Sequence, residues 1–194
     1  MKTDVVLAGV GGQGVLSAGA LVAHAALRDG WGVKQSEEHG MAQRGGSVLA
    51  FLRISDRAIA SEVVPQGTAD LVIATEPLEA LRAYPFLSKD GWLVTASEPV
   101  ANLEGYPPED ELLARIAALP NALVVPASRL AREAGVAQAV NVVLVGAALH
   151  RLPISAAAVE AELTRAFESH GQRVLQGNLR ALEAGQEAAA CPLS

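Results

Sequence analysis

Short apolar runs alternate with longer segments in which apolar residues recur every three or four positions, and this alternation continues to about residue 125. Continuous β-branched runs are typical of strands buried on both faces, whereas the three-to-four spacing indicates helices with one apolar side. The pattern predicts strands at residues 4–8, 31–36, 48–54, 70–75, 93–96 and 122–125, and a short additional strand at 58–63. It predicts helices at residues 15–28, 76–83, 109–119, 128–134, 141–149, 155–169 and 172–188.

Strands that alternate with helices are typical of an α/β fold, and we expect a three-layer α/β/α sandwich built on a largely parallel sheet. The last third of the chain is predicted to be helical only. One connection departs from the parallel pattern, because only the ten residues 37–46 join the second and third strands. A parallel return needs about a dozen residues or more, so we expect an antiparallel or irregular strand here. No repeat or linker divides the sequence, and we expect one domain spanning residues 1–194.

Composition narrows the classes of partner. Hydrophobic residues make up 51% of the chain and charged residues 19%, so either most of it is buried or a partner covers some apolar surface. The formal net charge of −6, without a basic run, argues against nucleic acid. The longest apolar stretch, Val142–Leu149, is far below the roughly 20 residues of a membrane helix, and the start shows no signal-peptide pattern. With Cys191 as the single cysteine, a cytoplasmic protein is expected.

The segment after the first predicted strand reads Gly9-Val10-Gly11-Gly12-Gln13-Gly14 and satisfies the dinucleotide fingerprint G-x-G-x-x-G. Glycines permit a tight turn, and the start of the following helix offers free N–H groups to an anion. Glu37 lies 23 residues after Gly14, about where an acid that binds ribose is expected. These features fit a stand-alone NAD- or FAD-binding oxidoreductase, although the short connection at 37–46 breaks that half-site. The motif equally permits close strand–helix packing, a cofactor edge or a subunit contact.

A polar loop follows the second predicted strand and reads Glu37-Glu38-His39-Gly40-Met41-Ala42-Gln43-Arg44-Gly45-Gly46-Ser47. Loops rich in functional groups often carry binding function. The guanidinium of Arg44 suits a carboxylate or a phosphate, and Gly45 and Gly46 let backbone amides approach the same anion. From chemistry alone, a solvated connection with turn glycines is an equal alternative. Glu37 and Glu38 point to opposite faces as strand neighbours, which disfavours a paired acid site.

Outside these two motifs, few side chains suggest chemistry. No two of the four histidines stand at a metal-ligand spacing, and we expect no metal site. The histidines are His24, His39, His150 and His170. Glu76 follows a predicted strand, so it fits either the edge that carries Gly9–Gly14 or the first turn of a helix. No catalytic residue is assigned.

The two motifs together, GVGGQGV and SEEHGMAQRGGSV in this order and spacing, resemble the gamma subunit or domain of pyruvate and 2-oxoacid:ferredoxin oxidoreductases. The form HGMAQRGG is most similar to the beta subunit of indolepyruvate:ferredoxin oxidoreductase. The resemblance continues at residues Asp70–Ala80, Asn141–Gly146 and Leu152-Pro153, and so covers most of the chain.

Enzymes of that family decarboxylate a 2-oxoacid oxidatively, form an acyl-CoA and reduce ferredoxin, using thiamine diphosphate with Mg and 4Fe-4S clusters. This chain has no G-D-G segment followed by asparagines and no cysteine-rich cluster motif. The resemblance therefore implies that these cofactors reside on a large thiamine- and cluster-bearing partner subunit, through which ferredoxin is reduced, and that this chain alone is inactive. A non-catalytic assembly module that keeps only the family's interface is a further alternative.

The resemblance also implies a substrate class and a site. We expect indolepyruvate or a related aryl or branched oxoacid as the substrate. We expect the two motifs to lie together at the partner subunit, where they line the path of coenzyme A or form the subunit interface. Arg44 would then pair with an anionic group of coenzyme A or with a partner carboxylate. The expected residues are Gly9, Gly11, Gly12, Gln13, Gly14, Glu37, His39, Gln43, Arg44, Gly45 and Gly46.

Overall fold

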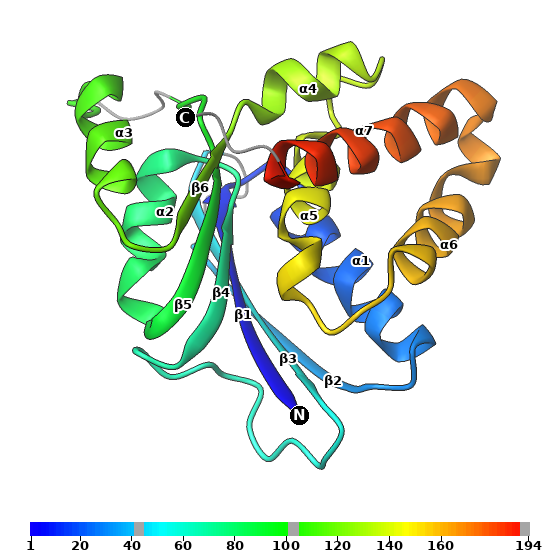
Figure 1. The fold of residues 1–194 in the computed structure, drawn as a ribbon, viewed down its shortest axis with the longest axis horizontal. Helices are drawn as coiled ribbons and strands as arrows, with labels where there is room; N and C mark the ends of the chain where they lie inside the picture. The colour runs from blue at the N-terminus through cyan, green and yellow to red at the C-terminus, as the bar shows by residue number, and fades with distance from the viewer. Residues whose placement is uncertain (41–44, 101–104, 191–194) are drawn as a thin grey trace.

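The computed structural model describes residues 1–40, 45–100 and 105–190, and it shows a six-stranded sheet with helices on both faces (Figure 1). The strands are β1 (Lys2–Val10), β2 (Gly32–His39), β3 (Ser47–Ser55), β4 (Ala69–Ala74), β5 (Leu87–Ala96) and β6 (Ala122–Val125). Their order across the sheet is β2-β3-β1-β4-β5-β6. The predicted three-layer α/β/α sandwich is confirmed.

The strands β1, β4, β5 and β6 run parallel to one another, whereas β3 runs antiparallel to both of its neighbours, β1 and β2. The pairing of β2 with β3 extends from Gly32 opposite Ser55 to His39 opposite Val48, so a hairpin joins these two strands. This confirms the antiparallel strand that the short connection predicted. The insertion of β3 between β1 and β2 was not predicted, because the pairing of β3 with β1 leaves no local signal in the sequence.

Helices cover both faces of the sheet. The face that carries Val5 and Leu7 of β1 packs against α1 (Val15–Arg28) and α5 (Val140–Ala148), with α4 (Ala127–Glu133), α6 (Ala156–Phe167) and α7 (Gln172–Ala190) around them. The face that carries Val6 and Ala8 packs against α2 (Pro77–Ala83) and α3 (Glu109–Ala117). Short 3-10 turns occupy Tyr84–Phe86, Leu149–Arg151 and Glu168–His170. Because both faces of β1 are buried, its apolar run is continuous.

The last third of the chain is helical, as predicted, and glycines let two of its helices approach closely. A Cβ on Gly146 of α5 would collide with the carbonyl oxygen of Leu182 of α7. A Cβ on Gly185 of α7 would likewise collide with the carbonyl oxygen of Val143 of α5. The two helices therefore pack backbone to backbone, and α7 (red in Figure 1) crosses α5.

The clearest error of the sequence prediction is the strand at residues 58–63, which does not form. These residues cross the neighbouring strands as a loop whose carbonyl groups bind side chains. The carbonyl oxygen of Ala60 accepts from Lys34 Nζ at 3.3 Å, and that of Ser61 accepts from Arg53 Nη1 at 3.0 Å. The carbonyl groups of this loop are thus hydrogen-bonded by side chains and not by the backbone of a neighbouring strand. Within the described ranges, no helix is long and apolar enough to cross a membrane.

Candidate functional site

The candidate site lies at the edge of the sheet where the parallel strands β1 and β4 end side by side, with Ala8 opposite Ala74. Each strand continues through a turn into a helix. The glycine turn leads β1 into α1, and residues 75–76 lead β4 into α2. Ligands of open α/β sheets commonly bind outside the carboxyl ends of such strands. We call residues 9–14, 45–47 and 75–76 the carboxyl edge.

Both sequence motifs meet at the carboxyl edge. The backbone N–H of Gly11 donates to the carbonyl oxygen of Gly46 at 2.8 Å, and the N–H of Gly45 donates to the carbonyl oxygen of Gly11 at 3.3 Å. The antiparallel pairing of β1 with β3 sets up this contact, because it ends with Val10 opposite Ser47. The end of the polar loop is therefore hydrogen-bonded to the glycine turn, although 34 and 35 residues separate Gly11 from Gly45 and Gly46.

Three expected residues lie wholly or partly outside the described residues, and a fourth lies away from the glycine turn. Gln43 and Arg44 lie outside the described residues, and so does the side chain of His39. Glu37 lies on β2 opposite Ala50, and its side chain is exposed. The strands β3 and β1 lie between β2 and β4, so Glu37 is not adjacent to the junction of β1 and β4.

Gln13 holds the glycine turn against β4. Its Oε1 accepts from the backbone N–H of Val10 at 2.9 Å and from Thr75 Oγ1 at 2.8 Å. Its Nε2 donates to the carbonyl oxygen of Thr75 at 3.3 Å. The amide of Gln13 is therefore used within the chain, where it ties together the ends of two neighbouring strands. The sequence interpretation grouped Gln13 with binding residues and did not foresee this positioning role.

The glycines of the turn have different tasks. A Cβ at Gly9 would collide with Thr75 Oγ1 and with Val15, and one at Gly14 would lie 2.8 Å from Asn141 Nδ2. These two glycines serve close packing. Gly12 has a φ of 101°, and none of the described residues has an atom within 4 Å of the position that its Cβ would take. Among the described residues nothing covers Gly12, so a ligand or partner can approach its surface as far as they are concerned.

A buried acid forms the β4 side of the carboxyl edge. Glu76 is 1% exposed and caps α2, because its Oε2 accepts from the backbone N–H of Glu79 at 2.9 Å. Its Oε1 accepts from the hydroxyl of Tyr106 and from the N–H of Val100 at 3.4 Å. Burial and the Glu76 carboxylate together raise the pKa of Tyr106. Both sequence interpretations of Glu76 are therefore correct, since it lies at the edge and also begins a helix.

Glu79 is a second buried acid that sequence reasoning missed. It is 3% exposed, and its Oε2 accepts from Ser47 Oγ at 2.5 Å while its Oε1 accepts from Arg82 at 2.6 Å. Ser47 directly follows Gly46, so this contact anchors the polar loop to α2. The only available signal was the position of Glu79 three residues after the cap, which gives no hint of its partner on β3.

The arrangement does not favour a dinucleotide site. In a dinucleotide-binding fold the second strand lies directly beside the first, so that its acid reaches the ribose. Here β3 separates β1 from β2 and from Glu37. Among the described residues, no group of three or more His, Cys, Asp or Glu could hold a metal ion. What the carboxyl edge offers is glycine surface and the start of α1, which none of the described side chains caps.

Comparison with known proteins gives a consistent result. A family model described as pyruvate ferredoxin/flavodoxin oxidoreductase matches residues 4–188. The indolepyruvate oxidoreductase subunit IorB of Archaeoglobus fulgidus is 37% identical over 194 residues, covering 95% of this chain and 94% of the relative. The pyruvate oxidoreductase subunit PORC of Thermotoga maritima superposes with a TM-score of 0.73 at 26% identity, covering 96% of each chain.

A longer protein contains the same fold as one of its parts. The 2-oxoglutarate:ferredoxin oxidoreductase of Magnetococcus marinus, solved with 2-oxoglutarate, coenzyme A and succinyl-CoA bound, superposes with a TM-score of 0.79. The match covers 97% of this chain and 31% of that one, at 23% identity. At this identity the likeness shows the fold alone.

Proposed function

Because the chain belongs to the pyruvate ferredoxin/flavodoxin oxidoreductase family, we propose that it is the subunit without cofactors of a thiamine-diphosphate-dependent 2-oxoacid:ferredoxin oxidoreductase. One observation carries this proposal. Nearly all of an indolepyruvate oxidoreductase subunit has a counterpart here, since 95% of this chain aligns with 94% of that relative. The proposed substrate is indolepyruvate or a related aryl or branched 2-oxoacid.

In such an enzyme the 2-oxoacid loses carbon dioxide, its acyl group passes to coenzyme A, and two electrons pass singly to ferredoxin. Thiamine diphosphate, Mg and 4Fe-4S clusters supply the carbanion chemistry and the electron transfer, and we place them on a large partner subunit. The composition supports this placement, since a 4Fe-4S cluster takes four cysteine ligands and the chain has one cysteine. Cluster chemistry also favours the reducing cytoplasm as the location.

We propose that the carboxyl edge helps to enclose the active site of the partner. None of the described residues covers Gly12 or caps the start of α1 with a side chain, and this favours backbone N–H groups there as donors to an anion. Coenzyme A carries such anionic groups, and a partner backbone could approach the same glycine surface. Gln13 positions this surface through its hydrogen bonds to Val10 and Thr75. We assign the remaining contacts to the polar loop that carries Glu37, His39, Gln43 and Arg44.

Co-purification of the chain with its large subunit, followed by an assay of indolepyruvate- and coenzyme-A-dependent ferredoxin reduction, tests the proposal. The complex should turn over, and this chain alone should not. Arg44→Ala should raise the KM for coenzyme A or weaken assembly by about tenfold or more, the effect of losing one charge-assisted hydrogen bond. Arg57→Ala, which removes an exposed arginine just beyond β3, should change neither value.

Two results would contradict the proposal: turnover of a 2-oxoacid by this chain without a partner, or equilibrium binding of NAD or FAD to it. Unchanged kinetics and unchanged association in Arg44→Ala would remove Arg44 from the site but leave the family's reaction in place. A partner that lacks thiamine diphosphate and clusters would show that the chain is an assembly module.

A further inference from the structure

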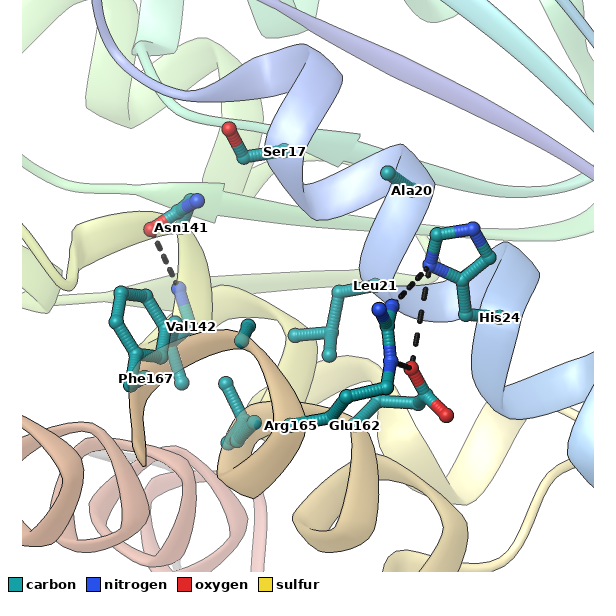
Figure 2. A pocket seen from close by; sticks show the side chains of 11 residues that line it. Ser17, Ala20, Leu21, His24, Asn141, Val142, Glu162, Arg165 and Phe167 are labelled. Atoms are coloured by element: carbon teal, nitrogen blue, oxygen red, sulfur yellow. Dashed lines mark hydrogen bonds and ion pairs between the residues drawn. The ribbon is translucent and has the colours of Figure 1, made fainter. Parts of the chain in front are cut away.

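A region outside the two motifs has the form of a ligand-binding cavity. It lies between α1, α5 and α6, has a volume of about 300 Å³ and is shown in Figure 2. We call it the helical cavity. A protein cavity of about 150 Å³ lined by apolar side chains binds benzene. The helical cavity therefore has room for a body of one or two rings together with a short polar group.

One part of the helical cavity is apolar. Leu21 of α1, Val142 of α5 and Phe167 of α6 line it, and Ala20 leaves space beside them. Figure 2 shows Phe167 and His24 at opposite ends. An aromatic side chain at the apolar end favours a ring as the occupant, because offset and edge-to-face ring pairs are more favourable than burial of the same area alone.

The other end of the helical cavity is charged, with Glu162 and Arg165 in its lining. Glu162 is 6% exposed and accepts from Arg28 Nη2 at 2.7 Å and from Arg165 Nε at 2.7 Å. Burial acts to raise the pKa of Glu162, but the hydrogen bonds and charges of Arg165 and Arg28 outweigh it, so this pKa lies below its usual value. Arg28 borders an adjoining hollow and does not line the cavity, but its ion pair with Glu162 gives the cluster of Arg28, Arg165 and Glu162 a charge of +1.

Donors remain at this charged end. Arg28 binds Glu162 through Nε and Nη2, and Arg165 uses Nε for Glu162 and Nη2 for His24 Nδ1, at 3.1 Å. The Nη1 of each arginine therefore has no partner in the described part of the chain. A guanidinium can only donate, so Nδ1 of His24 accepts and the ring proton resides on Nε2. His24 adds a further donor to the two arginines.

We propose that the helical cavity binds a small aryl carboxylate, with its ring against Leu21, Val142 and Phe167 and its carboxylate at Arg165 and His24. A carboxylate matches both the planar guanidinium and the single excess positive charge. The ligand is a monoanion of one or two rings, and either an aryl 2-oxoacid or an arylacetate has this chemistry. The inference goes beyond the proposed function, in which the 2-oxoacid is converted on the partner subunit.

Isothermal titration calorimetry of the full chain with indole-3-acetate tests the inference. One equivalent should bind, and Arg165→Gln should weaken the affinity by about tenfold or more, as expected when a charge-assisted hydrogen bond is lost. Ala20→Phe fills the cavity from α1 and should abolish binding. Arg129→Gln is the matched control, because it removes an arginine from an exposed ion pair with Glu133 on α4 and should leave the affinity unchanged. Circular dichroism establishes that each variant is folded.

Uncharged indole-3-acetamide should bind at least about tenfold more weakly than indole-3-acetate, because it cannot neutralise the excess charge. Tighter binding of indole-3-pyruvate than of indole-3-acetate would identify the 2-oxoacid as the ligand, and the reverse order would identify the arylacetate. Absence of saturable binding at millimolar concentration, equal binding of the amide, or full binding by Ala20→Phe would each overturn the inference.

The chain is titrated without its partner because the partner's substrate site would bind the same compounds. A failed titration would therefore leave the proposed function untouched, and an inactive complex would leave the helical cavity untouched. If the chain folds only with its partner, the same titration is made on two complexes, one with the wild-type chain and one with Arg165→Gln. In that comparison, identical numbers of bound ligands and identical affinities would overturn the inference.

Discussion

The carboxyl edge and the helical cavity differ in how their polar side chains are used. At the carboxyl edge, the amide of Gln13 and the carboxylate of Glu76 are occupied by groups of the same chain. In the helical cavity, Arg165 keeps its Nη1 without a partner among the described residues. At the carboxyl edge, where these side chains are already hydrogen-bonded, a partner can contact mainly the shape and the backbone of the turn. In the helical cavity, the remaining donors can bind an anionic ligand without a partner protein.

The largest expected effect tests close packing at the carboxyl edge. Gly9→Ala places a Cβ against Thr75 Oγ1 and Val15, so we expect the free energy of unfolding to fall by about 3 kcal/mol. Gly12→Ala is the matched control, in which only the positive φ resists substitution, and it should cost about 1 kcal/mol. Urea denaturation measures both losses. Equal losses would show that the turn is not packed as described.

A smaller effect is expected where the buried acid of the edge loses a donor. Tyr106→Phe removes the hydroxyl that Glu76 accepts from, and should lower the free energy of unfolding by about 2 kcal/mol at neutral pH. Tyr84→Phe is the control, because the Tyr84 side chain is 40% exposed and its change should have little effect. Chemical denaturation of both variants measures the difference.

The same pair of variants has a predicted pH dependence. Burial and Glu76 raise the pKa of Tyr106, so the folded chain holds the phenol proton more tightly than the unfolded chain. The resulting stability is complete below the unfolded pKa of about 10 and is lost as the pH rises through the higher folded pKa. The deficit of Tyr106→Phe should therefore shrink at alkaline pH, and a deficit that grows there would contradict the assigned contact.

The smallest effect tests the charges of the helical cavity. Glu162→Gln should lower the free energy of unfolding by about 1 kcal/mol at neutral pH, because both arginine partners are partly exposed to solvent. The depressed pKa of Glu162 means that its contribution is present above the unfolded pKa of about 4.3 and is lost as the pH falls through the folded value. Thermal unfolding against pH measures this loss.

The dependence of stability on salt concentration distinguishes the charged helical cavity from the closely packed carboxyl edge. Added sodium chloride should reduce the deficit of Glu162→Gln, since it screens partly exposed charges, and should leave that of Gly9→Ala unchanged. Glu160→Gln, on the exposed side of α6, is the control for any general effect of removing an acid. A deficit of Glu162→Gln that is independent of salt would show that packing, and not charge, dominates the helical cavity.

Local pattern predicted most of the fold because most of its elements carry their own signals. The helix α1 has the predicted bounds of residues 15–28, since its apolar spacing ends at Asp29-Gly30. The antiparallel direction of β3 followed from the length of one connection. The place of β3 between β1 and β2 could not be predicted, and the loop at 58–63 was mistaken for a strand. The pairing partner of β3 is distant in sequence, and the loop is held by side-chain donors on β2 and β3 that leave no periodic signal.

The same limit applies to the sites. The glycine motif and the polar loop are recognisable because their residues are contiguous, and the contact of Gly11 with Gly46 followed once their strands paired. Gln13 and Thr75 are 62 residues apart, and Arg28 and Glu162 are 134 apart. No periodicity encodes such pairs. The helical cavity was therefore not recognisable in the sequence, where no pattern distinguished His24 from the other histidines.

Asn141 belongs to both regions, because its Nδ2 donates to the carbonyl oxygen of Gly14 at 3.1 Å while the residue also lines the helical cavity. A molecule in the cavity that shifts this amide would break its hydrogen bond to Gly14, the residue directly before α1. Thermodynamic coupling is reciprocal, so anything that engages the turn would then change the affinity of the cavity by the same factor. Through Asn141, binding of an aryl ligand in the cavity would thus change the affinity of the glycine turn for the proposed partner subunit, and binding of the partner would change the affinity for the ligand.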